Sequence, residues 1–131
     1  MDIYVAGKTD DWERVRRIQE TVTVELGHEI THDWTEKIEQ DGEDVGLKAD
    51  DGSRREWADD DQLGVKRADL VIVCVDFEGL CGTLIELGMA LAYDKSVIVV
   101  GEPERNSIFF SHMNIMHVAH EDDVVSALSE Y

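Results

Sequence analysis

The chain is poor in basic residues: 12 Lys and Arg stand against 30 Asp and Glu, for a formal net charge of −18. Nucleic-acid backbones and anionic membranes need a basic footprint on a protein partner, so we expect neither as a partner. An acidic coat of this kind suits high salt, where screening relieves self-repulsion, and it also serves ordinary solubility. We favour the salt-adapted interpretation.

Long hydrophobic runs and cysteines are also scarce. No apolar stretch approaches the ~20 residues of a membrane span, and residues 1–6 lack the basic flank and apolar length of a signal peptide. The two cysteines, Cys74 and Cys81, make no disulfide framework. These absences predict a cytoplasmic protein. The five histidines show no ligand spacing with the cysteines, so we expect neither a metal nor another cofactor.

What the chain does contain is a set of short apolar segments that alternate with helical patterns. The segments expected to form strands are residues 3–6, 29–31, 70–75, 96–100 and 115–118. The segments expected to form helices are residues 12–26, 54–67, 83–93 and 122–131, the third of them well buried. An acidic stretch at 36–53 with three glycines is interpreted as a mobile surface segment and a candidate lid.

This alternation predicts one α/β domain over residues 1–131, doubly wound in the flavodoxin-like or Rossmann-like manner. We expect a five-stranded parallel sheet in the order 2-1-3-4-5, because the central strands are uniformly apolar. In that order the first and third strands are neighbours at the switch point. The loops after Ala6 and Val75 then meet at one crevice, where ligands bind in such folds.

Glu86 is the one carboxylate near the start of the helix that follows this crevice. A carboxylate aimed into such a pocket is a candidate nucleophile. The spacing Thr83-x-x-Glu86 is also that of a capping box, in which both residues would only terminate the helix. Burial and the positive end of the helix shift the pKa of such a carboxyl in opposite directions.

Two more residues are candidates for this crevice. Asp61 lies on one helical stripe with Trp57 and Val65, so it is either a pocket residue or a partner for a backbone amide. Tyr4 lies in the first strand, where a tyrosine is usually part of the core. Its hydroxyl needs a partner when buried, and a carboxylate across the switch point would provide one.

Two glycine-containing turns are candidate phosphate cradles. They are Gly7-Lys8-Thr9 after the first strand and Gly82-Thr83 before Glu86. Neither completes a P-loop or a dinucleotide fingerprint. Lys8 is positioned in the sequence to pair with a 5′-phosphate, or it is simply solvated.

Four stretches together resemble the nucleoside 2-deoxyribosyltransferase-like family, whose members cleave or exchange N-glycosidic bonds. The resemblance spans nearly the whole chain, and the Glu-Leu-Gly-x-Ala segment that begins at Glu86 is its most specific part. The stretches are Ile3-Tyr4-Val5-Ala6-Gly7, residues 61–69, Gly82-Thr83-Leu84-Ile85-Glu86-Leu87-Gly88-Met89-Ala90 and Lys95-Ser96-Val97-Ile98-Val99.

The resemblance implies a role for each matching residue. Glu86 would be the nucleophile, Tyr4 would orient it, and Asp61 would handle the base and its proton. A neighbouring subunit would supply an Asn-x-Met, which Asn114 and Met116 match. Together with the apolar segment at 108–110, this match predicts a homo-oligomer.

The chain departs from the family at one position. The exchange enzymes hold the base with an aspartate six residues before the nucleophile, where this chain has Leu80, so Asp76 or Glu78 would take that part. Transfer and hydrolysis therefore both stay open. The expected function is cleavage or transfer of the N-glycosidic bond of a small-molecule nucleoside or nucleotide through a glycosyl–Glu86 intermediate. The alternatives are a nucleoside 5′-monophosphate N-glycoside hydrolase, a non-catalytic nucleotide-binding module and an interaction scaffold.

Overall fold

A computed structural model describes residues 1–76, 79–103 and 107–131. These residues form a parallel sheet with the strand order β2-β1-β3-β4-β5. Its strands are β1 (Asp2–Ala6), β2 (Glu29–Ile30), β3 (Leu70–Cys74), β4 (Ser96–Val100) and β5 (Ile115–Val118). The predicted α/β class, the five parallel strands and their order are confirmed.

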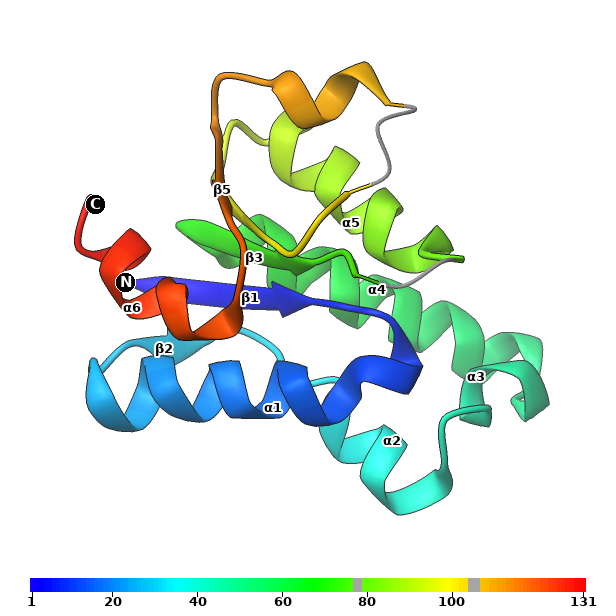
Figure 1. Ribbon diagram of the computed structural model, residues 1–131. Coiled ribbons are helices and arrows are strands. Elements are labelled where there is room, and N and C mark those ends of the chain that lie inside the picture. Colours follow the sequence, from blue (N-terminus) through cyan, green and yellow to red (C-terminus); the bar gives the residue numbers. More distant parts are fainter. Residues whose placement is uncertain (77–78, 104–106) are drawn as a thin grey trace.

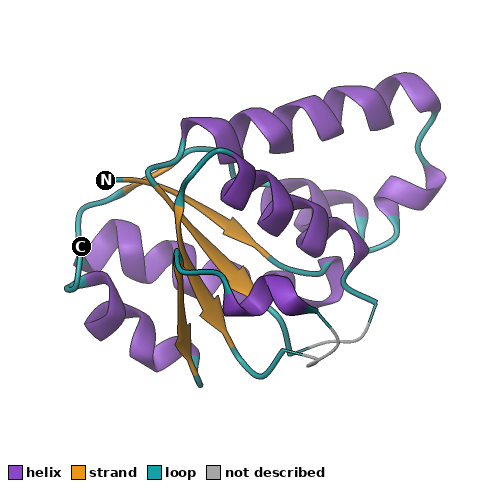
Figure 2. Ribbon diagram, turned by 90° about the horizontal axis from the view of Figure 1, so that it is seen from above, coloured by secondary structure: helices purple, strands orange, loops and turns teal. Residues whose placement is uncertain are grey.

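Helices cover both faces of this sheet, as the two ribbon views show (Figures 1 and 2). The α-helices of the described residues are α1 (Trp12–Glu20), α2 (Thr35–Asp41), α3 (Val45–Lys48), α4 (Asp51–Arg67), α5 (Cys81–Ala92) and α6 (Val124–Leu128). Short 3₁₀ segments are η1 (Thr9–Asp11), η3 (Ile108–Ser111) and η4 (Glu121–Asp123), and α1 continues into a π-helical turn, η2 (Thr21–Glu25). None of the described helices has the length and apolar character needed to cross a membrane.

The sheet divides the core into two layers because successive side chains of a strand point to opposite faces. In β1, Ile3 and Val5 pack with α1 and α6, whereas Tyr4 and Ala6 pack on the opposite face with α4 and α5. β3 is buried along its whole length. A strand covered on both faces needs apolar residues at every position, which explains the continuous apolar runs of the sequence.

The segment interpreted as a mobile surface segment, residues 36–53, contains most of α2, all of α3 and the start of α4, so it is largely helical. Asp33 orders the start of α2 by accepting hydrogen bonds from the backbone N–H and the hydroxyl of Thr35, at 2.9 and 2.5 Å. Arg16 of α1 bonds to the Thr35 hydroxyl and forms an ion pair with Glu39. The helix ends at Gly42, whose φ of 97° few other residues adopt.

Two helix boundaries differ from the predicted ones. α4 begins at Asp51, three residues early, because the carboxylate of Asp50 accepts a hydrogen bond of 2.8 Å from the N–H of Ser53. α5 begins at Cys81 with Leu80 at its N-cap, so Thr83 lies inside the helix and caps nothing.

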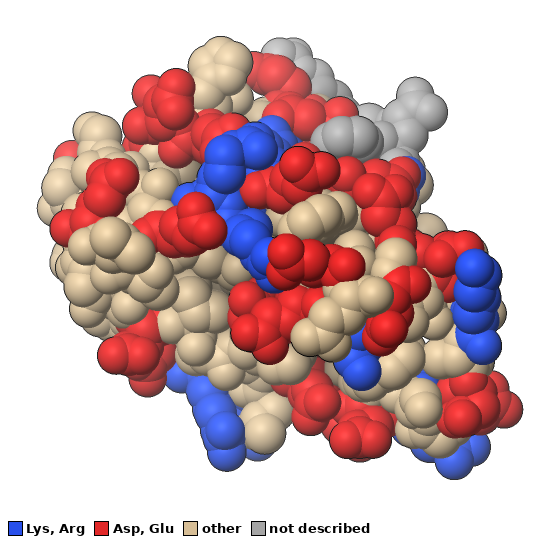
Figure 3. Space-filling model, turned by 90° about the horizontal axis from the view of Figure 1, so that it is seen from below, with Lys and Arg blue, Asp and Glu red and all other residues tan. Residues whose placement is uncertain are grey.

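α5 is also less buried than expected, since Leu84 and Ile85 are 43% and 61% exposed. At the C-terminus, the predicted helix over 122–131 divides into η4 and α6. The acidic composition of the chain is visible on the face that carries α1 and α2, where red side chains lie across the surface among fewer blue ones (Figure 3).

Candidate active site

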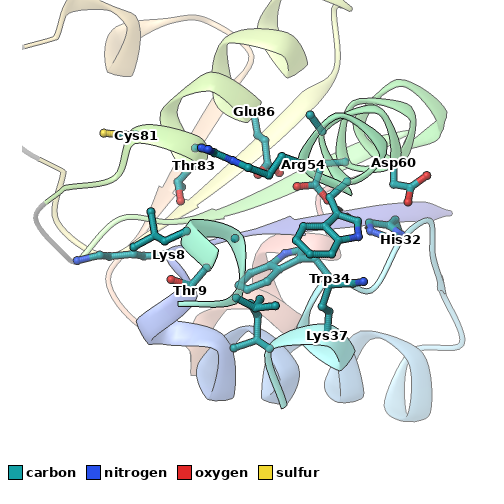
Figure 4. Close-up of a pocket in the computed structure, with 18 of the residues that line it drawn as sticks. Lys8, Thr9, His32, Trp34, Lys37, Arg54, Asp60, Cys81, Thr83 and Glu86 are labelled. Atoms are coloured by element: carbon teal, nitrogen blue, oxygen red, sulfur yellow. Dashed lines mark ion pairs between the residues drawn. The ribbon is translucent and has the colours of Figure 1, made fainter. Parts of the chain in front are cut away.

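A cavity of about 900 Å³ opens at the carboxyl edge of the sheet. The loops after β1 and β3 both line it, as the strand order predicts, and α2, α3 and α4 complete its wall. Its labelled side chains fall into two groups on either side of Glu86 (Figure 4). One group is Lys8, Thr9 and Cys81, and the other is His32, Trp34 and Lys37. We call these the Lys8 end and the Trp34 end.

Glu86 reaches the cavity from the second turn of α5. The residue is half-buried as a whole, but its Oε2 atom is inaccessible to solvent and has no hydrogen-bond partner among the described residues. Because Leu80 is the N-cap and no side chain caps this helix, the capping-box interpretation of Glu86 is wrong. The carboxyl is a buried polar group aimed at a cavity.

The environment of Glu86 favours its protonated form. Burial and, to a smaller extent, the negative charge of Asp61 raise the pKa of the carboxyl, whereas the Tyr4 hydroxyl lowers it, and together they shift it from its ordinary 4.5 to about 8. The helix N-terminus does not reverse this, because its effect fades beyond the first turn. Of the two opposing influences that the sequence suggested, burial therefore dominates.

Tyr4 lies beneath Glu86, fully buried on β1. Burial and the charges of Glu86 and Asp61 hold the pKa of its phenol well above the ordinary value. The hydroxyl lies near enough to Glu86 to lower that carboxyl's pKa, yet no hydrogen bond of normal geometry joins the two groups, and the hydroxyl has no other described partner. Two neighbouring unsatisfied groups, each costing about 1–3 kcal/mol, are typical of a functional site.

The wall behind Tyr4 is closed by Gly64 of α4. A Cβ atom at this position would lie 2.9 Å from the Tyr4 ring and 2.9 Å from Cβ of His32. Real side chains do not approach so closely, so α4 can contact β1 here only because residue 64 is glycine. This contact fixes the distance between Tyr4 and the helix that carries Asp61.

Asp61 has a partner that the sequence analysis missed. Its Oδ1 lies 3.3 Å from Nε2 of His32, and both side chains are about one-third exposed. The hydrogen bond with Asp61 raises the pKa of His32, against the opposing effect of burial. Of the two interpretations of Asp61, the pocket residue is the one observed, since both residues line the cavity. A histidine just after β2, at the carboxyl edge, was the signal available in the sequence.

The predicted phosphate residues gather at the Lys8 end. Lys8, Gly82 and Thr83 line the cavity, and Nζ of Lys8 lies 3.4 Å from Asp10. Gly7 supports the turn from below, because a Cβ there would lie 2.6 Å from Cγ2 of Val15.

Four of the predicted substrate-binding residues do not line the cavity, namely Gly7, Asp76, Asn114 and Met116. Asp76 forms an ion pair with Arg14 and accepts a 2.9 Å hydrogen bond from the N–H of Glu102. Asn114 precedes β5, at the opposite edge of the sheet, and Met116 packs against the core layer of α1 and α6. Glu78 lies outside the described residues. Within one chain, Asn114 and Met116 do not reach the cavity.

The Trp34 end contains aromatic and basic groups that the sequence analysis did not assign to a site. Trp34 donates a 2.8 Å hydrogen bond from its indole N–H to the carbonyl of Val5. Lys37 places its ammonium 4.0 Å from the ring centroid of Trp57. Within the described ranges, no group of three His, Cys, Asp or Glu side chains is arranged to hold a metal ion.

This architecture is shared with solved structures of other proteins, two of which are described below. The CMP N-glycosidase BcmB of Clostridium botulinum matches with a TM-score of 0.66 and 17% identity, over 100% of this chain and 99% of that one. A 2-deoxyribosyltransferase of Bacillus psychrosaccharolyticus matches with a TM-score of 0.61 and 20% identity, over 95% and 90% of the two chains. No protein-family model matches the sequence, and no curated protein matches it either. The chain has the fold of these nucleoside 2-deoxyribosyltransferase-like, N-glycosidic-bond enzymes, as the sequence motifs implied.

Proposed function

We propose that the protein cleaves or transfers the N-glycosidic bond of a nucleoside or nucleotide, with Glu86 as nucleophile. The observation that carries this proposal is the buried, unpartnered Glu86 carboxyl that faces the cavity beside Tyr4 and the Asp61–His32 pair. A buried group without a partner among the described residues is available for a partner that arrives with the substrate.

In the first step, a Glu86 oxygen forms a bond to C1′ of the sugar as the bond from C1′ to the base nitrogen breaks. The bonding electrons leave with the base, and the Asp61–His32 pair supplies the proton that neutralises it. In the second step, water or another base attacks C1′ and releases Glu86, and the Asp61–His32 pair, which gave up a proton in the first step, accepts the proton that the attacking group loses. Water gives hydrolysis and a base gives transfer, and two inversions at C1′ retain its configuration.

The raised pKa of Glu86 suits this chemistry. The transition state carries positive charge at C1′, which stabilises the ionised carboxylate in a way that the surrounding protein groups alone do not. Tyr4 can then donate its hydroxyl hydrogen to that carboxylate and orient it. Interactions that strengthen only in the transition state accelerate the reaction rather than tighten ground-state binding.

Two groups at the Lys8 end favour a nucleoside 5′-monophosphate over a nucleoside. Lys8 provides a cation, and Gly82 and Thr83 present the first turn of a twelve-residue helix. One of the structures described above is a CMP N-glycosidase, a nucleotide enzyme by its name. A non-catalytic nucleotide-binding module would use the same cavity, and the buried carboxyl is the feature that speaks against it.

The test is incubation with matched nucleosides and 5′-monophosphates, with and without an acceptor base, followed by chromatography. We expect release of free base, faster from monophosphates, and a new nucleoside if the protein is a transferase. Glu86→Gln should abolish release, and intact mass should show a sugar adduct only on the protein with Glu86. Nucleotide binding without base release over long incubation would instead establish the binding module.

We also propose a homo-oligomer, because apolar side chains are exposed on α5 and η3. They are Leu84 and Ile85 on α5 and Ile108 and Phe109 on η3, and Met113 is exposed just after η3. In such an assembly, Asn114 and Met116 would act on a neighbour's cavity. Light scattering should give a mass at least twice that of the 14.8 kDa chain, and a monomer at working concentration would contradict this.

A further inference from the structure

We propose that the Trp34 end of the cavity is the nucleobase subsite, and that Lys37 makes it selective for bases with a carbonyl oxygen at the edge remote from the sugar. This inference rests on the proposed N-glycosidic function, and it adds the part of the substrate that the cavity distinguishes.

The tryptophans give this end flat, rigid surfaces. Trp34 packs against both core layers, and its 2.8 Å hydrogen bond to Val5 fixes the plane of the indole. Trp57 lines the cavity from α4, one helical turn before Asp61. Stacking on such rings contributes about 1–3 kcal/mol per base and is tolerant of base identity. The rings therefore explain the binding of a base, and another group must select which base.

Lys37 is placed to make that selection. Its ammonium lies 4.0 Å from the centroid of the Trp57 ring, and it forms no ion pair with a described side chain. The neighbouring Lys48, by contrast, pairs with Asp44 at 2.9 Å and does not line the cavity. An ammonium only donates hydrogen bonds, so it stabilises a carbonyl oxygen and disfavours an amino group at the same place.

The arrangement of the cavity determines which edge of the base Lys37 meets. Figure 4 shows Lys37 across the cavity from Glu86. With C1′ at Glu86, a base that extends toward the Trp34 end turns its far edge to Lys37. That edge distinguishes uracil from cytosine and hypoxanthine from adenine, by an oxygen in place of an amino group. Asp61 and His32 remain near the bond that breaks.

The test measures binding separately from turnover. In the Glu86→Gln background, quenching of tryptophan fluorescence gives the Kd of uridine against cytidine and of inosine against adenosine. We expect the carbonyl member of each pair to bind about tenfold tighter, the effect of one charged hydrogen bond. Lys37→Met should bring both ratios close to one, Lys37→Arg should preserve them, and Lys48→Met should leave them unchanged.

The three tryptophans supply an internal control. Trp12 lies on α1 beside Arg16 and does not line the cavity. Trp34→Phe and Trp57→Phe should each weaken binding of all four nucleosides and reduce quenching, whereas Trp12→Phe should keep both. Quenching that depends on Trp12 alone, or ratios that Lys37→Met leaves intact, would overturn the subsite. Base-selective binding by a protein that cleaves no substrate would refute the enzymatic proposal and support the subsite.

Discussion

Replacing Glu86 with glutamine should stabilise the protein while it abolishes catalysis. The carboxyl's pKa is about 8 in the native state and 4.5 for an ordinary glutamate. One pKa unit corresponds to about 1.4 kcal/mol, so ionisation of the unfolded chain favours unfolding by about 3 kcal/mol at pH 7. The native state binds the proton more tightly. Its contribution to stability is therefore complete below pH 4.5 and is lost as the pH rises through about 8.

The assay is urea unfolding of the wild type and Glu86→Gln at fixed ionic strength and several pH values. The difference in unfolding free energy should grow by about 3 kcal/mol between pH 4 and pH 7 and level off at about 5 kcal/mol above pH 8. The glutamine amide adds a constant to this difference, so the slope with pH is the quantity that matters. Glu25→Gln, which changes an exposed glutamate at the end of η2, is the matched control. A difference that does not vary with pH would refute the account of Glu86.

The same carboxyl should control the pH dependence of activity. Since attack on C1′ requires the ionised form, kcat/KM should rise with pH, reach half its maximum near pH 8, the pKa of Glu86 in the free protein, and level off about one pH unit higher. A profile that is flat between pH 5 and pH 8 would show that another group is the nucleophile.

Three further perturbations test the packing against Tyr4, the ion pairs of Arg14 and the acidic surface. Gly64→Ala should displace the Tyr4 ring or His32, since the added Cβ lies 2.9 Å from each. We expect urea unfolding to show a loss of about 1–3 kcal/mol of stability, and base release to show a kcat at least about tenfold lower. An unchanged kcat would contradict the importance of this contact. Arg14→Met should lower the unfolding free energy measured in urea by about 3 kcal/mol, because Arg14 forms ion pairs with Asp76 and with the buried Asp11. A loss below about 0.5 kcal/mol would show that these ion pairs do not stabilise the fold. Added KCl should raise the Tm if the surface with net charge −18 is adapted to salt, and a Tm that falls or stays constant would refute that interpretation.

The sheet was predictable because its strands are buried on both faces and therefore apolar at every position. β3 and β4 show this most clearly, and the strand order followed from general rules of α/β folds. The helices of residues 35–48 were not predictable in the same way. Their glycines and acids suggest a loop, and the contacts that stabilise them, such as Arg16 with Glu39, join residues distant in the sequence.

The candidate site was predictable in its acids and not in their partners. Glu86 was found on an apolar helix near the crevice and Asp61 on an apolar stripe of its own helix, and both line the cavity. His32, Trp34 and Trp57 were missed because only the packing of α4 beside β1 brings them together. The start of α5 was misplaced since Thr83-x-x-Glu86 matches a cap locally, whereas the loop after β3 begins the helix earlier.

The two layers of the core contribute differently to the reaction centre. Tyr4, Glu86 and Asp61 belong to the layer of α4 and α5, while the layer of α1 and α6 contributes none of them. Substitutions in the layer of α1 and α6, for instance around Ile18, could therefore raise the stability of the fold without changing Tyr4, Glu86 or Asp61. Natural changes in thermal tolerance could likewise collect around Ile18, away from the three residues of the reaction centre.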